Sequence, residues 1–209
     1  MCYKVEQKAS TKVLTERFNA AFRLPELYTP QKEINAFNFP ELPLLTNEQE
    51  NEFSFHRWGL IPDWAEDIDI RKNTLNAKLE SVKEKPSFKS VTENRCILPV
   101  TGFYEWKWLD AKGKRKEKYL IRVKETEVFA LAGLFNNWKH THNTQNIKTF
   151  TLLTTKADTI MEEIHNTKKR MPLIMNVGQA QQYLENGTIE LNHDLIPKCV
   201  ESDGQLDLF

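Results

Sequence analysis

The sequence lacks any apolar run of about 18 residues, the length that a helix needs to cross a bilayer. It also lacks the charged segment followed by an apolar one that marks a secretory signal at the start of a chain. We therefore expect a cytoplasmic protein with reduced thiols and no contact with a membrane.

Cysteine is scarce. Cys2, Cys96 and Cys199 are an odd, widely spaced set without a Cys-x-x-Cys pair, so the sequence indicates neither a disulfide framework nor a zinc site. A glycine-rich phosphate loop and a His-Glu-x-x-His motif are also missing. We therefore expect no metal and no cofactor.

Net charge is absent as well, because 29 Lys and Arg residues balance 29 Asp and Glu residues. This balance argues against a broad electrostatic grip on duplex DNA, although it leaves room for a local basic groove. Basic runs lie at residues 112–118 and 168–170. We interpret the first run as a solvated loop, since Asp110 to Gly113 has the composition of a hairpin turn.

The length is sufficient for one domain. A chain of 209 residues buries about 70% of its surface on folding and needs no covalent staples. Apolar and alternating runs predict strands at residues 3–8, 52–60, 96–100, 102–108, 118–123, 128–134, 148–155 and 170–175. Strands joined mostly by hairpins favour an antiparallel α+β fold over a doubly wound sheet.

Helices are expected at four places. One begins at Ser10 or Thr11 and runs to Phe22, one covers residues 79–85, one follows Asp158, and one covers residues 177–186 with Gly187 at its C-cap. Residues 24–50, which hold four prolines, are expected to be mostly irregular, and residues 188–200 irregular. Trp58 and Trp64 flank the break at Pro62, and an exposed one could stack on an unpaired base.

Cys2 is the residue with the most distinctive chemistry. A small residue after Met normally permits removal of the initiator, and removal would leave a free α-amine beside the Cys2 thiol. Such an aminothiol condenses with an aldehyde through an imine to a thiazolidine ring. The α-amine has a pKa of about 7.7–8.0, so a nearby carboxylate or histidine is expected to assist it. The alternative is that cysteine stands at this position by accident.

Two titratable residues are candidates for that assistance. Glu105 lies within the aromatic run 103–108, where a buried carboxylate would be costly without a partner. Period two places it on the face opposite Tyr104, Trp106 and Trp108, so it is either a solvated strand residue or a catalytic acid or base. His165 falls in the last turn of a short predicted helix, where the helix dipole favours imidazolium and suits a proton donor; the alternative is a hydrogen-bonded structural histidine.

Several spaced motifs resemble one known family. They are Met1-Cys2, Arg57 to Trp64 (RWGLIPDW), Asn76 to Glu80 (NAKLE), Arg95 to Lys107 (RCILPVTGFYEWK), Phe129 to Leu134 (FALAGL), and Ile164-His165 followed by Arg170 to Leu173 (RMPL). Together they resemble the SRAP family, the SOS-response-associated peptidase-like or abasic site processing proteins. The resemblance runs in order from residue 2 to about residue 175.

The resemblance implies a single domain over residues 1–200, with an antiparallel β-barrel-like core and flanking helices, and a tail at residues 201–209. It implies binding of single-stranded DNA and a covalent thiazolidine between Cys2 and a ring-opened abasic site. We also expect a monomer that associates with the nucleoid when it is bound to DNA. Asn76, Glu105 and His165 match the other catalytic positions of the family. Self-directed peptidase activity that removes Met1, and lyase activity from the imine, are also implied.

The predicted DNA contacts are Lys4, Trp64, Lys78, Arg170 and Pro40. The chain departs from the family pattern at Tyr3-Lys4, where Gly-Arg is common, and at Lys78, where Arg is typical. An insertion of residues 166–169 separates His165 from Arg170 and makes the placement of Arg170 uncertain.

The tail resembles the short peptide by which bacterial repair proteins bind the replication sliding clamp. It offers the apolar anchors Leu206, Leu208 and Phe209 and the polar hook Gln205. The alternative is that this segment docks on its own domain.

Two other functions compete with the crosslinking one. The first is a peptidase with a cysteine nucleophile, whose main act is self-processing. The second is a non-covalent reader of modified or single-stranded nucleic acid, in which Cys2 is merely structural.

Overall fold

The computed structural model describes residues 2–139, 146–190 and 193–202. Within them a ring of five strands closes into a barrel. These strands are β4 (Glu41–Thr46), β5 (Gln49–Trp58), β7 (Arg95–Val100), β10 (Phe129–Lys139) and β11 (Asn146–Lys156). Four of the pairings are antiparallel, and the parallel pairing of β11 with β5, where Phe150 lies opposite Trp58, closes the ring. Closure leaves no free edge in the ring.

Short strands extend the barrel. β2 (Ala21–Phe22) pairs with β5, and β6 (Asn76–Lys78) and β12 (Arg170–Pro172) pair with β11. β13 (Ile174–Met175) pairs with β10. The barrel therefore carries segments from distant parts of the chain on its surface.

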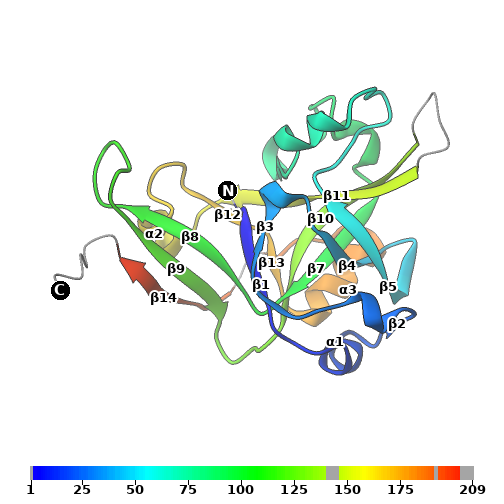
Figure 1. The fold of residues 1–209 in the computed structure, drawn as a ribbon, viewed down its shortest axis with the longest axis horizontal. Helices are drawn as coiled ribbons and strands as arrows, with labels where there is room; N and C mark the ends of the chain where they lie inside the picture. Colours follow the sequence, from blue (N-terminus) through cyan, green and yellow to red (C-terminus); the bar gives the residue numbers. More distant parts are fainter. Residues whose placement is uncertain (1, 140–145, 191–192, 203–209) are drawn as a thin grey trace.

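A second sheet lies beside the barrel, with the strand order β14-β9-β8-β1-β3. Its strands are β1 (Lys4–Gln7), β3 (Gln31–Asn35), β8 (Gly102–Trp108), β9 (Lys116–Val123) and β14 (Leu195–Ser202). Figure 1 shows β8 and β9 reaching out to the left of the barrel, while β1, in dark blue, lies between the two parts. Only Thr101 separates β7 of the barrel from β8 of this sheet, so one run of sequence joins both.

The barrel interior is filled by large apolar side chains. Trp58 and Phe150 stack with ring centroids 5.6 Å apart, and both are fully buried. The Trp58 indole donates to the Leu75 carbonyl at 2.8 Å, which satisfies its buried N–H. Cys96 is also fully buried there, in agreement with a structural cysteine.

Helices are short and peripheral among the described residues. They are α1 (Thr11–Phe18), α2 (Thr159–Ile164) and α3 (Val177–Asn186), with 3-10 turns η1 (Pro25–Leu27), η2 (Ala36–Asn38), η3 (Ile68–Asn73), η4 (Leu79–Ser81) and η5 (Lys89–Val91). Asn176 and Gln179 form a capping box at the start of α3, and Gly187 ends it in the left-handed conformation. The structure thus confirms the expected α3 and the α+β class with a barrel core.

Three predicted elements are wrong near the N-terminal half. The first helix ends at Phe18 rather than Phe22, because Asn19 turns left-handed and Ala21–Phe22 pairs with β5. Residues 24–50 are more regular than expected, since they contain β3, β4 and the start of β5, with Pro43 inside β4. Residues 79–85 form only the η4 turn and further turns instead of a helix.

Two further corrections concern the C-terminal half. Residues 170–175 form two strands, because at Leu173 the backbone bonds to both Leu153 and Ala132. Residues 188–200 are not irregular throughout, since β14 pairs with β9 from Leu195 onward. The Asp110 turn is confirmed, with the Gly113 N–H donating to the Asp110 carbonyl at 3.0 Å.

The helices found in the described part of the chain are all too short and too polar to pass through a lipid bilayer. Residues 203–209, which include the predicted clamp-binding peptide, lie outside the described residues. The division of the chain into a domain and a tail stays a prediction.

Candidate functional site

Cys2 lies directly before β1, and its side chain is fully buried. Its Sγ is 4.0 Å from the Lys4 carbonyl oxygen. The Asn76 side-chain amide donates to the Cys2 carbonyl at 2.9 Å. Asn76 reaches this point because β6 pairs with β11 on the barrel, with Asn76 opposite Leu152. Asn76, which is attached to the barrel through β6, therefore contacts Cys2, which lies at the start of the second sheet.

Glu105 reaches the same point from β8. The antiparallel pairing of β1 with β8 places Lys4 opposite Tyr104, so continuing the register sets Tyr3 level with Glu105. Glu105 is 3% exposed, which excludes a solvated strand face. Burial raises its pKa to about 7. Burial, with the charge of Glu105 added to it, raises the pKa of the Cys2 thiol far above its ordinary value.

His165 completes the group at the C-cap of α2, where its Nε2 lies 3.9 Å from Glu105 Oε2. Its Nδ1 is 2.7 Å from the Arg170 carbonyl oxygen and 3.2 Å from the Arg170 backbone nitrogen. A carbonyl can only accept, so the shorter contact favours a proton on Nδ1, with Nε2 as the acceptor that faces Glu105, whereas the longer contact from the Arg170 N–H favours the other tautomer.

The charge state of His165 differs from the sequence prediction. Burial lowers its pKa to about 4, and the positive charges of Lys168 and Arg170 act in the same direction. α2 has only six residues, so its dipole does not offset this desolvation. His165 is therefore neutral at pH 7, instead of the imidazolium that the helix position had suggested.

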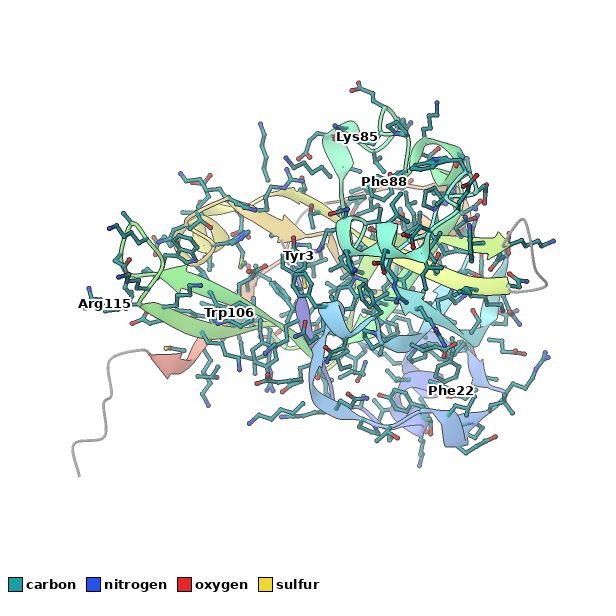
Figure 2. All side chains as sticks on the ribbon, turned by 45° about the horizontal axis from the view of Figure 1, so that its top comes forward. Tyr3, Phe22, Lys85, Phe88, Trp106 and Arg115 are labelled. Atoms are coloured by element: carbon teal, nitrogen blue, oxygen red, sulfur yellow. The ribbon has the colours of Figure 1, made fainter. Side chains whose placement is uncertain are left out.

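An open cleft of about 270 Å³ reaches Glu105 and His165, whereas Cys2 and Asn76 are not among the residues that line it. Its lining residues are Tyr3, Glu105, Trp106, Trp108, Lys116, His165, Thr167 and Lys168. The Tyr3 ring packs on Phe37, with centroids 4.9 Å apart. In Figure 2, Tyr3 stands near the middle of the molecule, Trp106 lies along the β8–β9 hairpin, and Arg115 marks the tip of that hairpin.

Sequence reasoning did not select Tyr3, Trp106, Trp108, Lys116 and Lys168 as site residues. Tyr3 could have been selected from the sequence, because it directly follows Cys2. The two tryptophans were placed on the face opposite Glu105, yet they line the same cleft, because twisted strands do not keep alternate side chains on strictly opposite faces near a hairpin end.

Of the predicted DNA contacts, four lie at or near the surface. Lys4 forms an ion pair with Glu33 at 2.8 Å and lies 5.5 Å from the Trp106 ring centre. Lys78 is exposed on β6, and Trp64 is 57% exposed, with its indole N–H donating to the Pro86 carbonyl at 3.1 Å. Pro40 is half-buried, and its carbonyl oxygen accepts a hydrogen bond from the backbone N–H of Trp58.

Arg170 does not fit the expected role of a DNA contact. Its guanidinium forms two hydrogen bonds of 2.9 Å to the Glu80 carboxylate and also bonds the Thr154 carbonyl. The residue is only 9% exposed. Its two terminal nitrogens thus bond inside the protein, while the buried Nε has no hydrogen-bond partner, and the inserted residues 166–169 precede a buried arginine rather than a surface one.

The arrangement is a cysteine-centred site, with an amide, a carboxyl group and an imidazole around a buried thiol, at the junction of a closed barrel and a second sheet. Within the described ranges, no group of three or more His, Cys, Asp or Glu side chains is arranged to hold a metal ion. The chemistry available there is nucleophilic addition with proton transfer.

The chain belongs to the SOS response associated peptidase (SRAP) family, whose model matches residues 1–205. It is 38% identical over 173 residues to the abasic site processing protein YoqW of Bacillus subtilis, covering 82% of this chain and 74% of that one. It is 36% identical to YobE of the same organism over 186 residues, covering 88% and 82%. A crystal structure of a Bacteroides thetaiotaomicron protein superposes with a TM-score of 0.81 at 32% identity, covering 90% of this chain and 83% of that one.

Proposed function

We propose that this protein binds single-stranded DNA at an abasic site and joins Cys2 covalently to the ring-opened sugar as a thiazolidine. The observation that carries the proposal is the meeting of Cys2 with Asn76, Glu105 and His165 beside an open cleft. The names of the relatives, abasic site processing proteins, agree with it. The finished ring consumes the aldehyde and so blocks strand cleavage at the lesion.

The first requirement is removal of Met1, because until then the Cys2 nitrogen belongs to a peptide bond. The freed amine attacks the aldehyde carbon, and loss of water gives the imine. The Cys2 thiol then adds across the imine: sulfur bonds to carbon, and its proton ends on nitrogen. No oxidant or reductant is needed, so the reaction balances with the protein and the DNA alone.

The order of the two additions follows from the electrostatics. A thiol whose pKa is raised by burial stays protonated at neutral pH, so the amine is the group that attacks first. The Glu105 carboxylate, with a pKa of about 7, can take the proton of the Cys2 ammonium. Asn76 holds the Cys2 carbonyl and thereby the position of the amine.

His165 has a relay role in this proposal. It is neutral, with Nε2 directed at Glu105, so it can receive a proton from the Glu105 carboxylic acid and pass it to the sugar ring oxygen as the ring opens. The 3.9 Å separation of Nε2 and Oε2 exceeds a direct hydrogen bond, so we propose that a substrate oxygen bridges the two groups in the relay. The imine intermediate also offers a route to lyase chemistry by β-elimination.

The same electrostatics disfavour a peptidase as the main activity. A cysteine peptidase needs a thiolate, and therefore a thiol pKa below its ordinary value. Here burial and Glu105 act in the opposite direction. The free amine could arise in two ways: the protein could remove Met1 itself, with Cys2 as the nucleophile, or an aminopeptidase could remove it. We propose that Met1 is removed and leave the agent open.

The cleft and its surroundings have suitable chemistry for single-stranded DNA. Aromatic rings at Trp106, Trp108 and the exposed Trp64 offer stacking surfaces. Lys4 and Lys78 provide positive charge for phosphates, and Pro40 follows three residues after Phe37, whose ring packs on Tyr3.

Intact mass spectrometry after incubation with an oligonucleotide that carries one abasic site tests the proposal. We expect loss of Met1, and a DNA-sized mass increment that survives denaturation without added reductant. An oligonucleotide of the same sequence without the lesion is the control and should give no increment. Loss of Met1 without any adduct would instead favour a peptidase or a non-covalent reader.

A second partner is proposed from the tail. Gln205, Leu206, Leu208 and Phe209 have the composition of a sliding-clamp-binding peptide. Deleting residues 205–209 should abolish binding to a bacterial sliding clamp in calorimetry, while adduct formation stays unchanged. Equal clamp affinity of the full and shortened chains would refute this assignment.

A further inference from the structure

The backbone of Arg170 holds one ring nitrogen of His165. The Arg170 carbonyl oxygen is 2.7 Å from Nδ1 and the Arg170 backbone nitrogen 3.2 Å from it, so the position of this backbone decides which contact dominates; the shorter one favours the tautomer in which Nε2 is an acceptor toward Glu105. The orientation of the imidazole therefore depends on where the backbone of residue 170 lies.

The segment between these two residues is short. Residues 166–168 form turns, and Lys169 adopts a left-handed conformation with φ of 48°, which is uncommon for a side chain of this kind. Two backbone bonds hold it, from Lys169 N to His165 O and from Ala157 N to Lys169 O. A further restraint at Arg170 would stabilise the end of this segment.

Glu80 supplies such a restraint through the Arg170 side chain. Its two carboxylate oxygens each accept one guanidinium N–H at 2.9 Å, a bidentate pairing that fixes direction as well as distance. The Arg170 side chain is 10% exposed and the Glu80 side chain 40%, so the pair is partly shielded from water. Thr155 Oγ1 also lies 3.4 Å from Glu80 Oε1.

Glu80 is linked to the other half of the site by the chain itself. It stands in η4, which follows β6 directly, and β6 carries the Asn76 that bonds the Cys2 carbonyl. One segment of five residues thus contacts Cys2 at its start and Arg170 at its end. β12 lies on the neighbouring part of β11, with Arg170 opposite Lys156.

We propose that Glu80 is a positioning residue for His165, acting through Arg170. The ion pair holds the Arg170 backbone so that its carbonyl accepts the Nδ1 proton, and Nε2 is kept toward Glu105. The expected effect of Glu80 on the crosslinking rate rests on the proposed function, whereas its expected effect on the tautomer of the His165 ring does not.

The test measures the tautomer of His165 and the crosslinking rate in the same variants. Long-range proton–nitrogen NMR of the ring, assigned with a His165→Gln variant, should show one neutral tautomer with the proton on Nδ1 in the native protein. Glu80→Ala should give a mixture of both tautomers and a crosslinking rate lower by about tenfold. Glu80→Gln, which keeps one acceptor for Arg170, should fall between the two.

Glu162→Ala is the matched control. Glu162, in α2, pairs with Lys169 at 3.5 Å, whereas Arg170 pairs with Glu80, so the removal of Glu162 should leave tautomer and rate unchanged. A single Nδ1–H tautomer in Glu80→Ala would overturn the proposal, and so would an equal tautomer shift in the control.

Two outcomes could otherwise obscure the result. If Glu80→Ala does not fold, Glu80→Gln decides: a measurable second tautomer supports the proposal, and its absence overturns it. If the native protein forms no adduct at all, the proposed function fails, but the tautomer comparison still decides the role of Glu80.

Discussion

Cys2→Ala should abolish the DNA adduct that survives denaturation, while single-stranded DNA is still bound. The alanine variant can present an amine after Met1 is removed, but an imine alone is reversed by water when no sulfur closes the ring. Complete loss of product is therefore expected, rather than a slower rate. Denaturing electrophoresis with an abasic-site oligonucleotide measures the adduct, and fluorescence anisotropy with an undamaged oligonucleotide measures the binding.

Cys199→Ala is the control for that experiment. Cys199 is exposed on β14, so it is the more accessible thiol, yet we expect its replacement to leave the adduct unchanged. If the Cys2→Ala variant still forms adducts and the Cys199→Ala variant forms none, the exposure of the thiol governs the reaction, and not the site around Cys2. Circular dichroism should verify that Cys2→Ala remains folded, since Cys2 is fully buried.

Glu105→Gln should lower the crosslinking rate by about 100-fold or more, the usual contribution of a positioned acid or base. The amide keeps the shape of the side chain but cannot take a proton from the Cys2 ammonium. The expected pH dependence follows from the raised pKa. The carboxylic acid form is favoured in the buried site, and the base becomes available only as the pH rises through about 7.

Single-turnover rates between about pH 5.5 and 9 would check this. The native rate should rise with pH through about 7, whereas the glutamine variant should keep only the titration of the amine, at about 7.7–8.0. Glu117→Gln, on β9 of the same hairpin and bonded to Tyr119, is the control and should follow the native profile. An unchanged rate and profile in Glu105→Gln would remove Glu105 from the proton transfer.

His165 illustrates why motif and geometry contribute different information. The motif alone placed it at the end of a short helix and suggested an imidazolium. The fold surrounds it with Arg170, Lys168 and buried backbone, which lowers its pKa to about 4. Helix position is a local property of the sequence, but desolvation arises from groups that are distant along the chain.

Arg170 shows the same limit for a binding residue. A basic residue next to a catalytic motif is a reasonable candidate for a phosphate contact when only the sequence is known. Its actual partner, Glu80, is 90 residues away, and no local pattern relates the two. Irregular stretches were misjudged for a similar reason: β3 has a single buried side chain, and β14 is a strand because β9 offers it an edge.

The sequence by itself determined the antiparallel α+β class, the run of strands from Arg95 to Trp108, the capped helix α3 and the selection of Cys2, Asn76, Glu105 and His165 as one set. The class, the strands and the helix depend on hydrophobic period and capping residues, which lie close together in the sequence, whereas the set of four residues rests on the resemblance to the motifs of the SRAP family. Only the tertiary structure decided that the barrel closes through the parallel pairing of β5 with β11, that Glu105 is buried and His165 neutral, and that Arg170 is turned inward to Glu80. Strand pairing, desolvation and ion pairs of this kind depend on which distant segments meet, and that is settled by packing of the whole chain.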